Sequence, residues 1–186
     1  GKEAPDAGEI TLPEGWHTAL LSPEPYVITW TNVRQNVAMA SGVGRTPEER
    51  YEHAMEYVKL VGLEDYADLS PVELYTGMKQ RLGLARVLAS QAEVLLMDEP
   101  FASLDFLTRA ELQHQVLQLQ QKLPRTILLV THQLDEALLL GQSITVMHPL
   151  GKTETFDLSH LSYPRDLENG KLKDLRRAVT EACRKD

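Results

Sequence analysis

The chain has 186 residues and a formal net charge of −8 at pH 7. Hydrophobic residues make up 42% of it and charged residues 25%, which is typical of a globular protein and excludes a disordered or fibrous chain. Its longest apolar runs, such as 94–97, are far shorter than the roughly 20 residues that a membrane-spanning helix needs. The acidic balance argues against nonspecific nucleic-acid binding, and the single cysteine, Cys183, excludes an internal disulfide framework.

Strand and helix patterns alternate along the chain, which predicts an α/β fold with a mostly parallel sheet. The first half is predicted to hold two short strands and three helices, at 9–12 and 17–22 and at 31–40, 46–61 and 77–89. The second of these helices has a strong start, because Thr46 suits the N-cap, Pro47 the first helical position and Glu49 the third. Gly62 stands where this helix should end.

The second half is predicted to alternate regularly between the two kinds of element. In chain order we expect a strand at 94–97, a helix at 107–123, a strand at 127–130, a helix at 135–140, a strand at 144–147 and a helix at 171–184. The first two strands are continuous apolar runs, which predicts that both of their faces are buried. The helix at 107–123 is expected to turn four residues inward, namely Leu112, Val116, Leu119 and Leu123. The tail helix is expected to bury Leu172, Leu175, Val179 and Ala182.

Polar residues capable of chemistry follow both buried strands. Asp98 and Glu99 follow the first strand, and His132 follows the second. Because ligands of parallel α/β sheets bind beyond the carboxyl ends of the strands, we expect these side chains to share one crevice. One carboxylate can hold Mg²⁺, the other can orient a water for attack, and the histidine can hydrogen-bond a phosphate oxygen. Taken singly, each residue is more often an ordinary loop or turn residue than part of a site.

Four segments together resemble the motifs of ABC-type ATPases. The segment 74–81 resembles the ABC signature, LSGGMKQR in its usual form, and 94–100 resembles the Walker B strand with its catalytic glutamate. The segment 101–105 resembles the D-loop, and 131–137 resembles the H-loop. The order and spacing of all four match the family, and the resemblance extends from about Pro5 to the tail helix.

The resemblance implies a P-loop NTPase (RecA-like) ABC ATPase fold whose N-terminal part is missing. Residues 1–30 and 93–165 would form the incomplete RecA-like core, and 31–92 a helical subdomain with a degenerate signature. Residues 166–186 would hold the C-terminal helix. The segment 4–10 resembles the stretch that follows the family's phosphate-loop helix, so the chain is expected to begin after that helix.

Two finer cues resemble one branch of the family. Trp30 with the segment 33–37, and the segment 163–165 before the tail helix, resemble nitrate, sulfonate and taurine importer ATPases, and bicarbonate importers share the pattern. This implies an importer subunit for small anions that couples ATP binding and hydrolysis to transport. It would work with a second ABC ATPase subunit, identical or different, and with a transmembrane permease. It would therefore lie in the cytoplasm, at the inner face of a membrane.

The resemblance also implies a role for each motif residue. Asp98 would help to hold Mg²⁺, Glu99 would be the general base that polarises the attacking water, and His132 would contact the γ-phosphate of ATP. Asp105 would lie at the interface between two subunits. The signature residues would face the nucleotide of the opposite subunit, and they are Tyr75, Thr76, Gly77, Met78 and Gln80.

The sequence departs from the family at several positions. The phosphate loop, G-x-x-x-x-G-K-[ST], is absent from the 186 residues, and the short matches at 1–2, 42–44 and 151–153 are more typical of turns. Pro23 stands where the family has a glutamine, and Tyr75 and Thr76 replace a serine and a glycine. Since the phosphate loop supplies most of the electrostatic stabilisation of phosphoryl transfer, we expect negligible ATP hydrolysis and weak or absent ATP binding by this chain alone.

Two hypotheses of different kinds therefore remain open. The first is an ATPase subunit without its N-terminal part, which the initial Gly1 and the intact Glu99 and His132 favour. The second is a degenerate, non-hydrolysing structural or regulatory partner, which Pro23 and the altered signature favour. Nucleic-acid binding through the basic residues of the tail is a weaker third reading, because acidic residues stand among them and a solvated helix face explains them.

Overall fold

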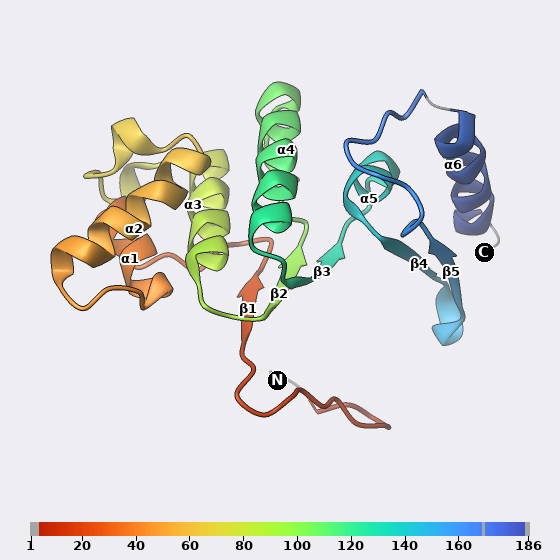
Figure 1. Ribbon diagram of the computed structural model, residues 1–186, viewed down its shortest axis with the longest axis horizontal. Coiled ribbons are helices and arrows are strands. Elements are labelled where there is room, and N and C mark those ends of the chain that lie inside the picture. The colour runs from red at the N-terminus through yellow and green to blue at the C-terminus, as the bar shows by residue number, and fades with distance from the viewer. Residues whose placement is uncertain (1–3, 169, 185–186) are drawn as a thin grey trace.

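The computed structural model describes residues 4–168 and 170–184. Figure 1 shows the helices and strands laid out in a row, and between residues 94 and 147 the two kinds of element alternate along the chain. The strands are β1 (Thr18–Leu21), β2 (Val94–Asp98), β3 (Thr126–Val130), β4 (Ser143–Met147) and β5 (Thr153–Asp157). The helices are α1 (Val33–Ser41), α2 (Pro47–Leu60), α3 (Thr76–Ala89), α4 (Phe106–Lys122), α5 (Leu134–Leu140) and α6 (Gly170–Cys183). The predicted α/β character is confirmed.

The first three strands form a parallel sheet in the order β1-β2-β3. The register aligns Leu21 with Met97 and Asp98 with Val130, so the carboxyl ends of β2 and β3 lie next to each other. β4 does not join this sheet but pairs antiparallel with β5 in a separate hairpin. The short connection turns at Leu150 and Gly151, which both have positive φ, and this turn lets β5 fold straight back on β4.

Two strand predictions are wrong in ways that share a physical cause. No strand forms at 9–12, where Ile10 lies largely in solvent and none of the described strands offers a ladder. β3 forms as predicted but is not buried on both faces, because Leu128 is 60% exposed and Val130 is similarly open. β3 is an edge strand of the described sheet, and one face of that sheet has no helix over it in the described residues.

The main core lies on the other face of the sheet. Leu21, Leu95 and Met97 point into it, and α3 and α4 stand on that side in Figure 1. The buried residues of α3 include all four that the helical pattern predicts, Met78, Leu82, Ala85 and Leu88. In α4 the inward positions Leu112 and Val116 are confirmed and Leu119 packs against the core. Leu123 is exposed, because the helix ends at Lys122.

The helical segment between β1 and β2 packs α1, α2 and α3 together. The ends of α2 are set by capping residues close by in the sequence. Thr46 caps α2 by accepting a bond from the backbone N–H of Glu49, whose side chain reaches back in a capping box, as predicted. Gly62 has φ of 65° just beyond the end of α2, which is the left-handed conformation that glycine adopts readily. The division of the chain into domains at residues 30, 92 and 165 stays a prediction.

The C-terminal part has a second, smaller core. It joins α5, the β4–β5 hairpin and α6 through Leu138, Ile144, Leu158 and Val179. Leu172, Val179 and Ala182 of the tail helix are buried as predicted, while Leu175 is half-buried. Gly1, Lys2 and the basic tail residue Lys185 lie outside the described residues. Among the described helices, none combines the length and the apolar character that a membrane crossing requires.

Candidate functional site

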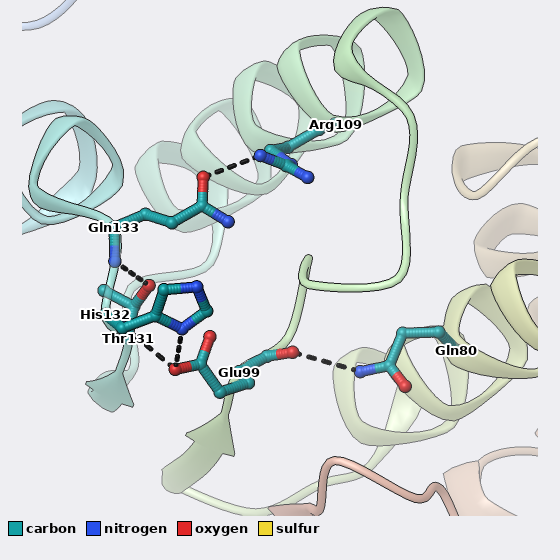
Figure 2. A network of polar contacts seen from close by, with 6 residues as sticks. All are labelled: Gln80, Glu99, Arg109, Thr131, His132 and Gln133. Atoms are coloured by element: carbon teal, nitrogen blue, oxygen red, sulfur yellow. Dashed lines mark hydrogen bonds and ion pairs between the residues drawn. The ribbon is translucent and has the colours of Figure 1, made fainter.

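Glu99 and His132 lie side by side at the carboxyl ends of β2 and β3. The backbone N–H of Glu99 donates to the carbonyl of Val130 at 2.9 Å, which continues the ladder one step beyond β2. The Glu99 side chain then turns toward the residues that follow β3. Oε1 accepts the backbone N–H of His132 at 3.0 Å and lies 2.6 Å from Nδ1 of the His132 ring (Figure 2).

The backbone of Glu99 is strained. Its φ is 49°, in the left-handed region that residues other than glycine rarely occupy. Such a conformation costs about 1–3 kcal/mol and persists only where the surroundings hold it. Here the backbone N–H and the carboxylate are held by the end of β3 and by His132. The strained turn therefore aims the carboxylate at His132.

The two side chains differ in exposure and in unused hydrogen-bonding capacity. The Glu99 side chain is 22% exposed and the His132 side chain 72%. Oε2 of Glu99 is buried and has no hydrogen-bond partner in the described part of the chain. Because a carboxylate only accepts hydrogen bonds, Nδ1 of His132 carries the proton in this contact, which leaves Nε2 on the other side of the ring. Within the described chain, the pair thus leaves one buried carboxylate oxygen, Oε2 of Glu99, without a hydrogen-bond partner.

Gln80 contacts the backbone of this turn. Gln80 is 2% exposed, and its Nε2 donates to the carbonyls of Glu99 and Pro100, each at 3.3 Å. Figure 2 shows the contact with Glu99. Gln80 thus connects α3 to the peptide that follows β2. Its amide contacts backbone rather than the molecular surface, so a direct contact of Gln80 with a nucleotide stays a prediction.

The start of α3 and the segment 101–105 enclose a second feature, a surface cavity of about 240 Å³. Its lining consists of Tyr75, Gly77, Met78, Arg81, Ser103, Leu104, Asp105 and Thr108. Three of the predicted signature residues and Asp105 thus come together, whereas Thr76 is exposed beside the cavity and does not line it. A Cβ on Gly77 would stand 3.1 Å from the carbonyl oxygen of Ser103, so glycine permits this close approach.

Asp105 has a structural role in addition to its place in the cavity. It is the N-cap of α4, and its Oδ1 accepts the backbone N–H of Thr108 at 3.1 Å. Hydrogen bonds from the Thr108 side chain and backbone lower the pKa of the Asp105 carboxyl. The cap thereby fixes the position from which α4 leaves the 101–105 segment.

Asp98 is the remaining predicted site residue. It is half-buried, closes β2 and lies outside the cavity. No group of three or more His, Cys, Asp or Glu suited to a metal ion occurs within residues 4–168 and 170–184. One carboxylate is a fitting donor for Mg²⁺ only where nucleotide phosphates and water supply the other ligands. The donor set therefore fits a magnesium ion that arrives with a nucleotide.

Two residues of the network in Figure 2 escaped the sequence reasoning. Nη1 of Arg109 donates to Oε1 of Gln133 at 2.6 Å, and Nη2 of Arg109 donates to the carbonyl of Leu104 at 2.8 Å. The backbone N–H of Gln133 donates to Oγ1 of Thr131 at 3.1 Å. The available signal was only that Gln133 follows His132 directly and that Arg109 stands one turn after Asp105.

Comparison with known proteins decides the family. The sequence pattern of the family described as ABC transporter matches residues 1–102, more than half of the chain. The chain belongs to the ABC transporter family. The taurine import ATP-binding protein TauB of Rhizobium johnstonii is 42% identical over 126 residues, which cover 66% of this chain and 47% of that protein. The aliphatic sulfonates import ATP-binding protein SsuB of Granulibacter bethesdensis is 42% identical over 147 residues, which cover 79% of this chain and 59% of that protein.

The fold agrees with this assignment. The dimeric structure of the ATP-binding cassette MJ0796 bound to ADP and Pi matches with a TM-score of 0.70 at 24% identity, over 77% of this chain and 63% of that one. This ABC transporter chain spans less than two thirds of the length of each of these relatives. The P-loop NTPase fold of the ABC type, predicted from the motifs, is therefore confirmed for the part of the fold that the chain contains.

Proposed function

We propose that this chain is part of an ATP-binding subunit of an ABC importer for small anions of the taurine and sulfonate kind. The observation that carries the proposal is the Glu99–His132 pair, held at 2.6 Å at the ends of two adjacent parallel strands. The relatives named for import of taurine and of aliphatic sulfonates support the solute class. Nitrate and bicarbonate belong to the same class of small anions and are included in the proposal.

Each residue of the pair has a defined task in hydrolysis of ATP. Oε2 of Glu99 is buried and unpartnered in the described chain, so it would accept a proton from the attacking water. The His132 ring would keep the carboxylate in place through Nδ1, and with a proton on Nε2 as well it would donate from that nitrogen to a phosphate oxygen. Asp98 would hold magnesium, which when bound with ATP neutralises charge on the phosphates. The strained turn at Glu99 keeps these groups aligned before substrate arrives.

The same proposal assigns partners to two surfaces. A second ATPase subunit would approach the cavity between Gly77 and Asp105, where its bound nucleotide would meet the start of α3. A permease would approach the region of Trp30, which is 83% exposed, and of the exposed Val72. Trp30 and Val72 lie on segments joined by the bond from Ser70 Oγ to the Thr29 carbonyl. Exposed aromatic and aliphatic side chains of this kind are typical of protein interfaces.

The alternative, a non-hydrolysing structural or regulatory partner, draws on the start of α3. Tyr75 occupies the N-cap position without a side-chain cap and is largely exposed. Its ring would add bulk where a phosphate approaches the start of α3. Pro23 has no side-chain donor or acceptor for a water or metal ligand. Both features oppose an active site while leaving the fold intact.

One experiment distinguishes the two proposals. Phosphate release from MgATP is measured for the chain alone, and for a fusion that precedes it with the phosphate-loop segment of a related taurine import ATP-binding protein. We expect negligible turnover by the chain alone and measurable turnover by the fusion. Glu99→Gln should abolish that turnover, because an amide cannot accept the proton. Glu93→Gln is the matched control, since Glu93 precedes β2 and lies at the opposite end of that strand.

Each possible result supports or contradicts a different part of the proposal. Turnover by the chain alone that Glu99→Gln abolishes would contradict the need for a phosphate loop. A fusion that binds MgATP in calorimetry but hydrolyses none supports the non-hydrolysing partner. A fusion that hydrolyses ATP equally well with Glu99→Gln removes Glu99 from the proposed role.

A further inference from the structure

Two polar contacts join α4 to the segment that carries His132. The first is the bond from Nη1 of Arg109 to Oε1 of Gln133 at 2.6 Å. The second is the bond from Nε2 of Gln113 to Oε1 of Glu136 at 2.9 Å, between two side chains that are both buried. Arg109 and Gln113 are one helical turn apart and therefore project from the same face of α4.

Arg109 also contacts the segment 101–105, which directly precedes α4. Its second nitrogen, Nη2, donates to the carbonyl of Leu104, next to the N-cap Asp105. Its backbone N–H donates to the carbonyl of Asp105 at 2.9 Å. One guanidinium group thus bridges the 101–105 segment and the loop that follows β3. A planar guanidinium with several donors is well suited to hold two acceptors at a fixed separation.

The His132 ring stands on the segment that this bridge contacts. It is largely exposed and contacts Glu99 through one edge. The residues on both sides of it are tied, since the backbone N–H of Gln133 donates to Thr131 and the Gln133 side chain accepts from Arg109. A ring with so little packing of its own follows the backbone that bears it.

We propose that Arg109 and Gln133 form a polar link that holds the His132 ring against Glu99 and makes its position follow the 101–105 segment. Arg109 is a positioning residue in this link, because it acts through Gln133 and touches neither Glu99 nor a substrate. The catalytic meaning of the link rests on the proposed function. A partner subunit that contacts Asp105 would shift the first turn of α4 and, through Arg109, would shift His132.

The link is tested on the chain itself by nuclear magnetic resonance of the histidine rings at pH 8. Long-range proton–nitrogen spectra distinguish the Nδ1–H from the Nε2–H form of a neutral imidazole, and His132→Asn identifies the His132 signal. In the wild-type chain we expect the Nδ1–H form, because Nδ1 faces a carboxylate at 2.6 Å. In Arg109→Met we expect the ratio of Nδ1–H to Nε2–H to fall about tenfold, since losing a charge-assisted hydrogen bond loosens the ring.

Two further variants make the test specific. Arg109→Lys keeps one charged donor and should recover part of the ratio. Arg125→Met is the matched control, because the Arg125 guanidinium also donates two hydrogen bonds, to the carbonyls of Leu88 and Ser90, but stands at the opposite end of β3. We expect the control to leave the His132 signal unchanged. If Arg109→Met does not fold, Gln133→Leu, which removes the acceptor and keeps the size, gives the same readout.

An unchanged His132 ratio in folded Arg109→Met or Gln133→Leu would overturn the link. An equal fall in Arg125→Met would also overturn it, because the effect would then be a general loss of stability. The readout involves no nucleotide, so the link can hold even if the fusion described above hydrolyses no ATP. Conversely, a fusion that hydrolyses ATP while the ratio stays unchanged would retain the proposed function and reject the link.

Discussion

The two faces of the β1-β2-β3 sheet have opposite environments although the same strands build them. On one face Leu95 is 1% exposed and packs with Met97 into the main core. On the other face Leu128 is 60% exposed and Leu20 is similarly open. Alternate residues of one strand point to opposite faces, so apolar composition alone does not distinguish the two environments. What separates them is the presence of α3 and α4 on one side.

The comparison shows where the stability of this chain resides. Parallel sheets are normally covered on both faces, and the continuous apolar runs of β2 and β3 have the composition of such strands. In the described chain only one face has its helices, so Leu128 and Val130 of the edge strand β3 are exposed. The central strand β2 keeps Val94, Leu95 and Met97 buried and Leu96 half-buried. The apolar residues of the open face form a surface that another polypeptide layer would fit. Two predictions test this difference between the faces, and a third tests the contact by which β1 joins the sheet.

The largest effect is expected from a pair of leucine truncations on the two faces. Leu95→Ala should lower the free energy of unfolding by about 2–5 kcal/mol, because it empties a site in the closed core. Leu128→Ala should lower it by less than about 1 kcal/mol, because most of that side chain already meets water. Urea unfolding followed by circular dichroism measures both values. Equal losses would mean that the face of Leu128 is covered in solution, for instance by self-association.

A smaller effect is expected from adding a methyl group between α3 and the sheet face that it covers. A Cβ on Gly83 of α3 would lie 2.4 Å from Cβ of Pro25 and 2.9 Å from Cδ1 of Leu21. Gly83→Ala should therefore lower the free energy of unfolding by about 1–3 kcal/mol through overpacking, despite the better helix propensity of alanine. Gly170→Ala at the start of α6 is the control, since its Cβ would meet nothing within 4 Å. A stabilised Gly83→Ala would show that β1 and α3 are not packed as closely as described.

The smallest effect concerns the contact where β1 joins the sheet. The carboxylate of Glu93, before β2, accepts the backbone N–H of His17, before β1, at 2.8 Å. This bond is the main cause that lowers the pKa of Glu93. A lowered pKa in the folded state gives stability that is present above the unfolded value of about 4.3 and is lost as pH falls through the folded value.

Glu93→Gln removes this titrating carboxyl, so the free energy of unfolding should fall less in the variant than in the wild type between pH 5 and pH 3. The difference should be roughly that of a single exposed contact. Thermal unfolding of wild type and variant across that pH range measures how steeply the stability of each depends on pH. Glu24→Gln is a suitable control, because Glu24 is an exposed carboxylate after β1. Parallel slopes for wild type and Glu93→Gln would show that the Glu93–His17 contact does not hold β1 in register.

Local sequence patterns predicted most of the helices and strands and one part of the site, the adjacency of Glu99 and His132. The capping box of Thr46 and Glu49, and the apolar face of α3, depend on residues a few positions apart, so they are legible in the sequence. The adjacency of Glu99 and His132 was also predictable, because parallel strands end at one edge. The positive φ of Glu99 and the burial of Gln80 were not, since both depend on contacts between α3, β2 and β3.

The sequence by itself determined the family motifs, the order of helices and strands and the identity of the residues at the strand ends. These follow from short-range periodicity, caps and spacing. Only the tertiary structure decided that β4 leaves the sheet for a hairpin, that one sheet face stays open and that Arg109 bridges two loops. Those features arise from pairings between distant parts of the chain, where many partners satisfy the same local pattern and packing selects among them.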